Sequence, residues 1–176
     1  MEIQIIIPWG DGRNLGGHYN RLMQNVNDWV CFLDHDILNL CPHWYHMCLN
    51  AVETVGHTAG WITGVTNAIA CPNQYCPDAP KTNDILDHMR YAKQRYTQFE
   101  NNLFFIDPAT MGLPFSGFMI LTHKEAWEKA GGFTDGCLGV DNIYFKNVTD
   151  SGYKAYVLPG LYVYHLYGQK RAWDTF

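Results

Sequence analysis

The chain lacks any hydrophobic run long enough to span a bilayer, and it has no block of basic residues. A membrane-spanning helix needs about 20 consecutive apolar residues, so we expect no transmembrane segment. The formal net charge is −5, and without clustered lysine and arginine we expect no binding of nucleic acid. The opening Met-Glu-Ile lacks the basic and apolar regions of a signal peptide. We therefore expect a cytoplasmic protein, of a cell or of an infected host.

Charged residues are also scarce, at 16%, and no internal repeat, linker or domain boundary interrupts the 176 residues. A hydrophobic content of 47% in a chain of this length predicts one globular domain with its own core. The six cysteines are expected to be reduced in a cytoplasmic protein. Aromatic residues reach 15%, which suits either core packing or stacking on sugars and bases. Such a composition also favours self-association, so a homo-oligomer is among the expected partners.

Apolar runs of strand length alternate with helical patterns along the chain. Strands are predicted at 3–7, 29–33, 61–65, 118–121, 153–158 and 161–164, and helices at 19–26, 42–55, 84–98, 122–131 and 141–149. Thr122 and Glu125 have the spacing of a capping box for the fourth helix. Alternation of this kind predicts an α/β fold, with a mixed, mostly parallel sheet flanked by helices.

The segment Trp-Val-Cys-Phe-Leu-Asp-His-Asp at 29–36 carries the clearest chemical signal. A buried strand ends in Asp34 and Asp36, two carboxylates separated by one residue. Carboxylates this close repel each other unless a cation lies between them, and Mg²⁺ and Mn²⁺ prefer oxygen ligands of this kind. The alternative is an ordinary Asp-rich turn after a strand.

Several further segments occur in a characteristic order. They are I-I-I-P (5–8), G-R-N-L-G-G-H-Y-N (12–20), F-L-D-H-D (32–36), S-G-F-M-I-L (116–121), G-G-F (131–133), G-V-D (139–141), S-G-Y-K (151–154) and V-Y-H (163–165). This series resembles the family 2-like glycosyltransferases of the GT-A fold, over about 120 of the 176 residues. The resemblance implies one Rossmann-like domain over 1–176. It would comprise a nucleotide and metal half (1–67), an acceptor-region insertion (68–115), and a sugar and acceptor half with a tail (116–176).

The resemblance implies a metal-dependent hexosyltransferase. Such an enzyme moves a sugar from a nucleotide-diphosphate sugar, with UDP or GDP, to a hydroxyl of a glycan or other acceptor. Asp34, Asp36 and His165 match the positions that hold Mn²⁺ or Mg²⁺. Asp141 matches the general base of inverting members, which deprotonates the acceptor hydroxyl. The alternatives are a half-buried strand-end histidine at 165 and a helix N-cap at 141.

Donor-binding residues follow from the same resemblance. Trp9 is placed to stack on the nucleobase, or it is an ordinary core or rim tryptophan. Cationic side chains at 13, 170 and 171 are placed to reach the diphosphate, or they are solvated surface. The full predicted donor set is Pro8, Trp9, Asp11, Arg13, His35, Ser116, Gly117, Lys170 and Arg171. Tyr91, Arg95 and Tyr96 are candidates for the acceptor groove, or they are packing residues.

The sequence departs from the family pattern in two places. Val140 and Ile143 replace acids that usually flank the catalytic one. Only four residues separate Pro8 from Arg13, where family members insert a further strand and a base-reading turn. The nucleotide-binding half is therefore shortened. Three consequences are open: base selectivity is loose, Asp11 takes over part of the base reading, or partner chains complete the site.

Three alternatives remain open at this stage. The first is a non-catalytic relative that binds a nucleotide sugar or a glycan. The second is a phosphohydrolase of the D-x-D type, although those enzymes carry the motif on their first strand. The third concerns Cys41, His43, His46 and Cys48, whose proximity in sequence also suits a structural zinc site.

Overall fold

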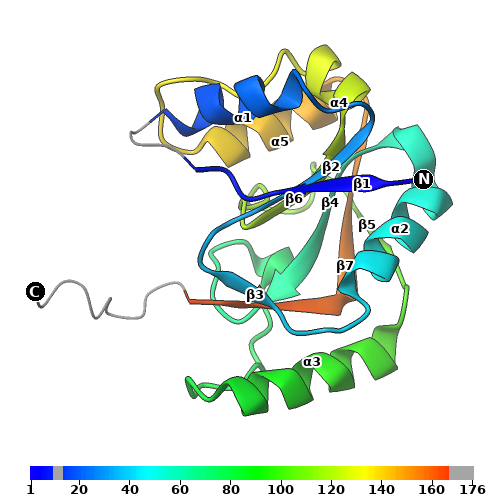
Figure 1. Cartoon of the computed structure of the whole chain (residues 1–176), viewed down its shortest axis with the longest axis vertical. Helices are drawn as coiled ribbons and strands as arrows, with labels where there is room; N and C mark the ends of the chain where they lie inside the picture. The colour runs from blue at the N-terminus through cyan, green and yellow to red at the C-terminus, as the bar shows by residue number, and fades with distance from the viewer. Residues whose placement is uncertain (10–13, 167–176) are drawn as a thin grey trace, which may run out of the picture.

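The computed structural model describes residues 1–9 and 14–166, and it shows an α/β fold (Figure 1). The described chain forms a seven-stranded mixed sheet with the order β1-β2-β6-β4-β7-β3, and β5 also pairs with β7. The strands are β1 (Ile3–Ile6), β2 (Trp29–Leu33), β3 (Ile37–Asn39), β4 (Ala59–Thr66), β5 (Phe104–Ile106), β6 (Met119–His123) and β7 (Lys154–His165). The α-helices are α1 (Leu15–Met23), α2 (Trp44–Val55), α3 (Ile85–Phe99), α4 (Lys124–Lys129) and α5 (Val140–Asp150). The arrangement is compatible with a Rossmann-like fold.

The expectation of a mostly parallel sheet is wrong. Among the strands of the described residues, β1–β2 and β4–β7 are parallel pairs, and the pairs β2–β6, β4–β6, β3–β7 and β5–β7 are antiparallel. Two of the antiparallel pairs arise because β6 lies between β2 and β4 and runs against both, and the other two arise because the short strands β3 and β5 run against β7. Periodicity in a sequence reports how far a strand is buried, and it carries no information on the direction of the neighbouring strand.

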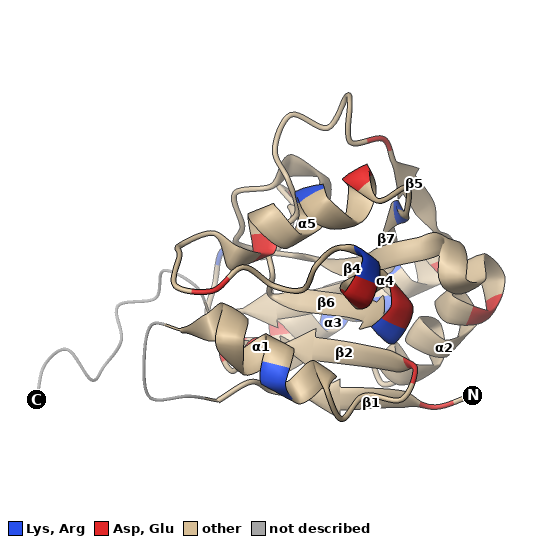
Figure 2. Cartoon of the chain, turned by 90° about the horizontal axis from the view of Figure 1, so that it is seen from above, with Lys and Arg blue, Asp and Glu red and all other residues tan. Residues whose placement is uncertain are grey.

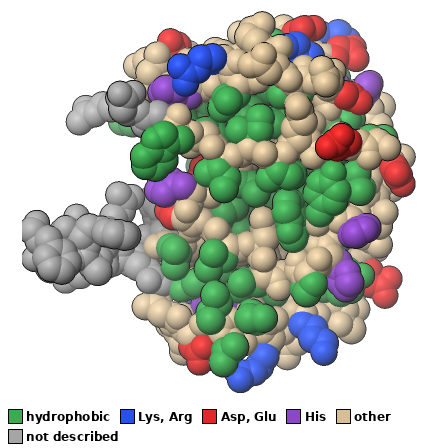
Figure 3. All heavy atoms as spheres, viewed as in Figure 1, with side chains coloured by type: hydrophobic (Ala, Val, Ile, Leu, Met, Phe, Trp, Pro, Cys, Tyr) green, Lys and Arg blue, Asp and Glu red, His purple; other side chains and the backbone are tan. Residues whose placement is uncertain are grey.

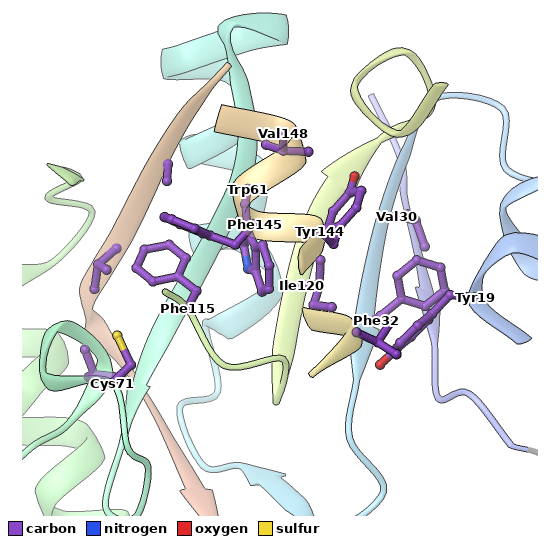
Figure 4. Close-up of a cluster of buried hydrophobic side chains, with 14 of the residues drawn as sticks. Tyr19, Val30, Phe32, Trp61, Cys71, Phe115, Ile120, Tyr144, Phe145 and Val148 are labelled. Carbon is purple, nitrogen blue, oxygen red and sulfur yellow. The ribbon is translucent and has the colours of Figure 1, made fainter. Parts of the chain in front are cut away.

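The two faces of the sheet are covered by different helices. Val30 and Phe32 of β2 pack with α1 and α5, whereas the alternate residues Trp29 and Cys31 pack with α2. Figure 4 shows the first of these clusters, in which side chains of α5 meet Trp61 and other strand residues. Because β2 is buried on both faces, its sequence is a continuous apolar run and does not alternate with polar residues.

The last strand differs from its prediction as two strands. Residues 154–165 form a single strand that passes through Pro159 and Gly160. Both halves pair with β4, and a register shift between Thr63 and Val65 absorbs the irregularity. A Cβ on Gly160 would lie 2.6 Å from the carbonyl oxygen of Glu100, so this close approach requires glycine.

Several predicted boundaries also move. Asn14 caps α1 by accepting a hydrogen bond from Gly17 N, so the helix begins four residues before the predicted Tyr19. The capping box at Thr122 is wrong, because His123 caps α4 and the Thr122 hydroxyl donates to Gly60 O. The short strands β3 and β5 had no expected counterpart, since three residues give too little periodicity to recognise.

Surface composition agrees with the low charge of the sequence. Lys and Arg are dispersed among acidic residues in the described chain (Figure 2), and hydrophobic side chains occupy much of the face seen in Figure 3. No helix of the described residues has the length and apolarity needed to cross a membrane. All six cysteines are free thiols. The predicted zinc alternative is not supported, because Cys41 and Cys48 are buried in the core while the ring of His43 packs in a tilted arrangement against Tyr96.

Candidate functional site

A hollow of about 560 Å³ lies at the carboxyl ends of β1, β2 and β7, which point to the same side of the molecule (Figure 1). We call it the first hollow. Nine residues predicted from the sequence line it: Pro8, Trp9, Asp34, His35, Asp36, Ser116, Gly117, Asp141 and His165. Ligands of open α/β sheets bind at this end of the strands. The structure therefore brings most of the predicted site into one cavity.

The remaining predicted residues fall into two groups. Asp11, Arg13, Lys170 and Arg171 lie outside the described residues. The three acceptor candidates are on α3, where it packs against β7. Tyr91 is buried and donates to Asp78 Oδ1, Arg95 Nε donates to Pro159 O, and the ring of Tyr96 packs in a tilted arrangement against His43. Their contacts are those of packing residues, and the insertion at 68–115 contributes Ile69 and Ala70 to the cavity instead.

Three carboxylates crowd the floor of the first hollow. Asp34 follows β2 directly and is held by a hydrogen bond from its own N–H to Phe118 O, at 3.0 Å. Burial, followed by the charges of Asp36 and Asp141, raises the pKa of Asp34 to about 7. A carboxyl group that resists ionisation beside two others is the electrostatic condition that a bound cation relieves.

His165 completes this group with a defined tautomer. Its Nδ1 lies 3.1 Å from the carbonyl oxygen of Ala68 and so carries the proton, which assigns the lone pair to Nε2. Nε2 lies 3.5 Å from Asp36 Oδ1. Burial lowers the pKa of His165, which favours the neutral ring. A histidine that donates through one nitrogen to a carbonyl and presents the other is the usual form of a metal ligand.

The backbone around His165 is fixed by Asn67 and β3. The Asn67 side chain donates to His165 O at 3.1 Å and accepts from His165 N at 2.8 Å. Ile37 of β3 pairs with His165, and Leu166 N donates to Asp36 O. These contacts bring the histidine to the same point as the two acids. Ligand atoms of Asp34, Asp36 and His165 lie within 4.8 Å of one another. Two carboxylates and an imidazole at this spacing could hold a metal ion.

Asp141 occupies the first turn of α5, at the border of the first hollow. Its Oδ2 accepts from Gly117 N at 2.8 Å, and its Oδ1 accepts from Asn142 N. The alternative role as N-cap is wrong, because Gly139 holds that position with φ +77°. A Cβ on Gly117 would lie 2.9 Å from the Cβ of Asp141, so glycine permits this approach. The carboxylate is thus positioned by backbone groups from two segments.

Sequence reasoning missed some contributors to the site. Gln74 is fully buried, and its amide donates to Ser116 O and Thr63 Oγ1 while it accepts from Ser116 N. It therefore clamps the segment that carries Gly117. Tyr19 lines the hollow, and burial together with Asp34 and Asp141 raises the pKa of its phenol, which stays protonated. The position of the polar residue Asn67 directly after a buried strand indicates a role near the site. No feature of the sequence near Gln74 indicates its contact with Ser116.

A second hollow, of about 750 Å³, adjoins the first and shares Leu15, Tyr19, Asp34, Gly117 and Asp141 with it. Its far wall is the loop of residues 136–139 that leads into α5. A ligand that spans both hollows would therefore pass beside Asp141.

The described residues contain one other group of metal-capable side chains, formed by His57, His123 and Glu125. His123 is fully buried, and its Nδ1 accepts a hydrogen bond from Ala126 N. The proton of the neutral ring is therefore on Nε2, which has no hydrogen-bond partner. A protonated nitrogen has no lone pair for a metal, so this group is a poor ligand set.

No family model matches the chain, and no curated protein matches it. The geometry of the first hollow therefore carries the functional argument.

Proposed function

We propose that the protein is a metal-dependent glycosyltransferase of GT-A type that uses a nucleotide-diphosphate sugar. The observation that carries the proposal is the convergence of Asp34, Asp36 and His165 in one hollow that also contains Asp141. A divalent cation held by the first three residues would neutralise charge on the departing diphosphate. The position of the hollow also supports the proposal, because it lies at the strand ends where α/β sheets bind nucleotides.

In the proposed reaction, different residues of the chain bind the sugar and accept the proton. Ser116 and Gly117 present backbone to the sugar, and Gln74 keeps that backbone in place. Asp141 accepts the proton of the acceptor hydroxyl while the oxygen of that hydroxyl bonds to the anomeric carbon. The bond from that carbon to the diphosphate oxygen breaks, and the electron pair leaves with the diphosphate. Attack opposite the leaving group inverts the anomeric centre.

A screen of nucleotide sugars, each with and without Mn²⁺, tests this function. A thermal shift that requires both components identifies the donor, because ligands that bind only the folded state raise its stability. Asp141→Asn should then lower transfer by about 100-fold or more while the donor shift remains. Asp150→Asn, on the exposed end of the same helix, serves as the matched control. An Asp141→Asn enzyme with the wild-type rate contradicts the role of Asp141.

A non-catalytic binding protein is the second candidate. It is favoured by Val140 and Ile143, which stand where the family has acids, and Val140 is buried in the core. For such a protein the donor shift would appear, but neither transfer to an acceptor nor hydrolysis of the donor would follow. The phosphohydrolase alternative receives no comparable support, because Asp34 follows the second strand of the chain.

A further inference from the structure

The second hollow has an unusual wall for a site that would hold a sugar. Its only charged side chains among the described residues are Asp34 and Asp141, at the border with the first hollow. The other lining side chains are apolar or weakly polar: Leu15 and Tyr19, which also line the first hollow, and Cys137, Leu138 and Val140. Hydroxyl-rich ligands need convergent polar groups to replace their bonds to water. This wall offers few such side chains and much apolar surface.

The loop that forms the wall is tied to α1. Asp135 accepts from the Asn14 amide at 3.0 Å and from Gly17 N at 3.3 Å. A Cβ on Gly16 would lie 2.0 Å from the carbonyl oxygen of Thr134, so the loop lies directly on the helix. The wall is therefore held in place by the fold, through contacts with α1 that lie just before the start of α5.

The same loop presents a leucine to solvent at the rim of the hollow. Gly136 and Gly139 both have left-handed backbone, with φ of +66° and +77°, and they frame Leu138. Leu138 is 97% exposed, and Leu15 on the facing helix is 43% exposed. Both side chains line the hollow, so an apolar ligand seated there would remove their surface from water. Each methylene that is buried in this way contributes about fourfold in affinity.

We propose that the second hollow binds an acceptor with an alkyl or aryl body, whose reacting hydroxyl, or the sugar that bears it, lies at Asp141. This inference rests on the proposed glycosyltransferase function and specifies its acceptor. The apolar body lies against Leu15, Leu138 and Val140, while the hydroxyl reaches the carboxylate. The proton passes to Asp141, the acceptor oxygen bonds to the anomeric carbon, and the nucleoside diphosphate leaves with the electron pair.

Matched glycosides test the inference without any need for turnover. Methyl and hexyl glucoside, and methyl and hexyl galactoside, are titrated into the full chain by calorimetry. The hexyl member of each pair should bind about tenfold more tightly or better, because part of its chain is buried. Leu138→Asp should reduce this preference to about threefold or less. Leu86→Asp should keep it, since Leu86 is 54% exposed on α3 and lines neither hollow.

The outcomes separate this inference from the proposed function. Equal binding of methyl and hexyl glycosides overturns the inference, and so does a full hexyl preference in Leu138→Asp. Transfer that is equally efficient to both glycosides, with a normal Mn²⁺-dependent donor shift, overturns the inference and leaves the glycosyltransferase function standing. A hexyl preference with no donor shift for any nucleotide sugar contradicts the glycosyltransferase function, and the acceptor role falls with it.

Discussion

Two groups of metal-capable side chains lie at opposite ends of the paired strands β2 and β6. Asp34, Asp36 and His165 gather beyond the carboxyl end of β2, while His57, His123 and Glu125 gather at its amino end, where Trp29 pairs with His123. Both groups contain a buried histidine with a hydrogen bond at Nδ1. In His165 the nitrogen donates to a carbonyl, and in His123 it accepts from a backbone N–H.

The two histidines therefore carry the ring proton on different nitrogens, and the position of this proton determines which group can bind a metal. Donation from Nδ1 places the lone pair of His165 on Nε2, toward the carboxylates. Acceptance at Nδ1 places the proton of His123 on Nε2, where it blocks a metal bond. Proximity of ligand types is therefore insufficient evidence for a metal site, and the hydrogen bonds of each histidine must be read as well.

The largest expected difference is between two substitutions, one that removes an acid from the first group and one that removes an acid from the second. If the proposed function is right, Asp36→Asn should abolish the Mn²⁺-dependent thermal shift and lower transfer by about 1,000-fold, since a cation bound there would contribute several kcal/mol to the transition state. Glu125→Gln should change neither measurement, because the proton on His123 Nε2 makes the second group a poor ligand set. Loss of the Mn²⁺ shift in Glu125→Gln would reverse the comparison between the groups.

Acid should destabilise the protein through His123. Burial, with His57 nearby, lowers the pKa of His123 from 6.5 to about 4. The unfolded chain therefore binds a proton more readily than the folded one. The contribution of His123 to stability is complete above pH 6.5 and is lost as the pH falls toward 4, by on the order of 3 kcal/mol.

Urea unfolding at pH 7 and pH 4.5 measures this effect when wild type is compared with His123→Asn, a side chain that caps helices and does not titrate. The comparison is needed because Asp34 acts in the opposite sense. Its raised pKa of about 7 means that its contribution to stability is lost as the pH rises from about 4 to 7. A variant with the same loss of stability in acid as wild type would show that His123 is not the titrating group.

The sequence alone predicts which residues line the first hollow better than it predicts the sheet that positions them. Asp34, Asp36, Asp141 and His165 each follow or begin an element with a strong local pattern, and the order of the motifs supplies their grouping. Strand direction depends on the insertion of β6 between β2 and β4, which no local pattern encodes. The same limit explains why β3 was not expected, although its pairing with β7 places Asp36 beside His165.

Contacts between distant residues are the other part that the sequence does not reveal. Gln74 reaches Ser116 across 42 positions, and Asn67 reaches His165 across 98. Neither residue belongs to a recognisable motif. Their roles come from tertiary packing, which brings a polar side chain to an unpaired backbone group. Supporting residues of a site are for this reason harder to predict than the ligands that they position.

The smallest expected effect tests one of these supporting contacts. Asn67→Ala removes both hydrogen bonds to the backbone of His165 but leaves the three ligands in place. Loss of such outer contacts typically weakens metal binding by 10–100-fold, so the apparent Kd for Mn²⁺ should rise by about that factor in calorimetric titrations. Asn50→Ala, at an exposed position of α2, is the matched control and should leave the Kd unchanged. Unchanged Mn²⁺ affinity in Asn67→Ala would mean that the pairing of β3 with β7 alone holds His165, and the contrast with His123 would then depend on the Ala68 carbonyl.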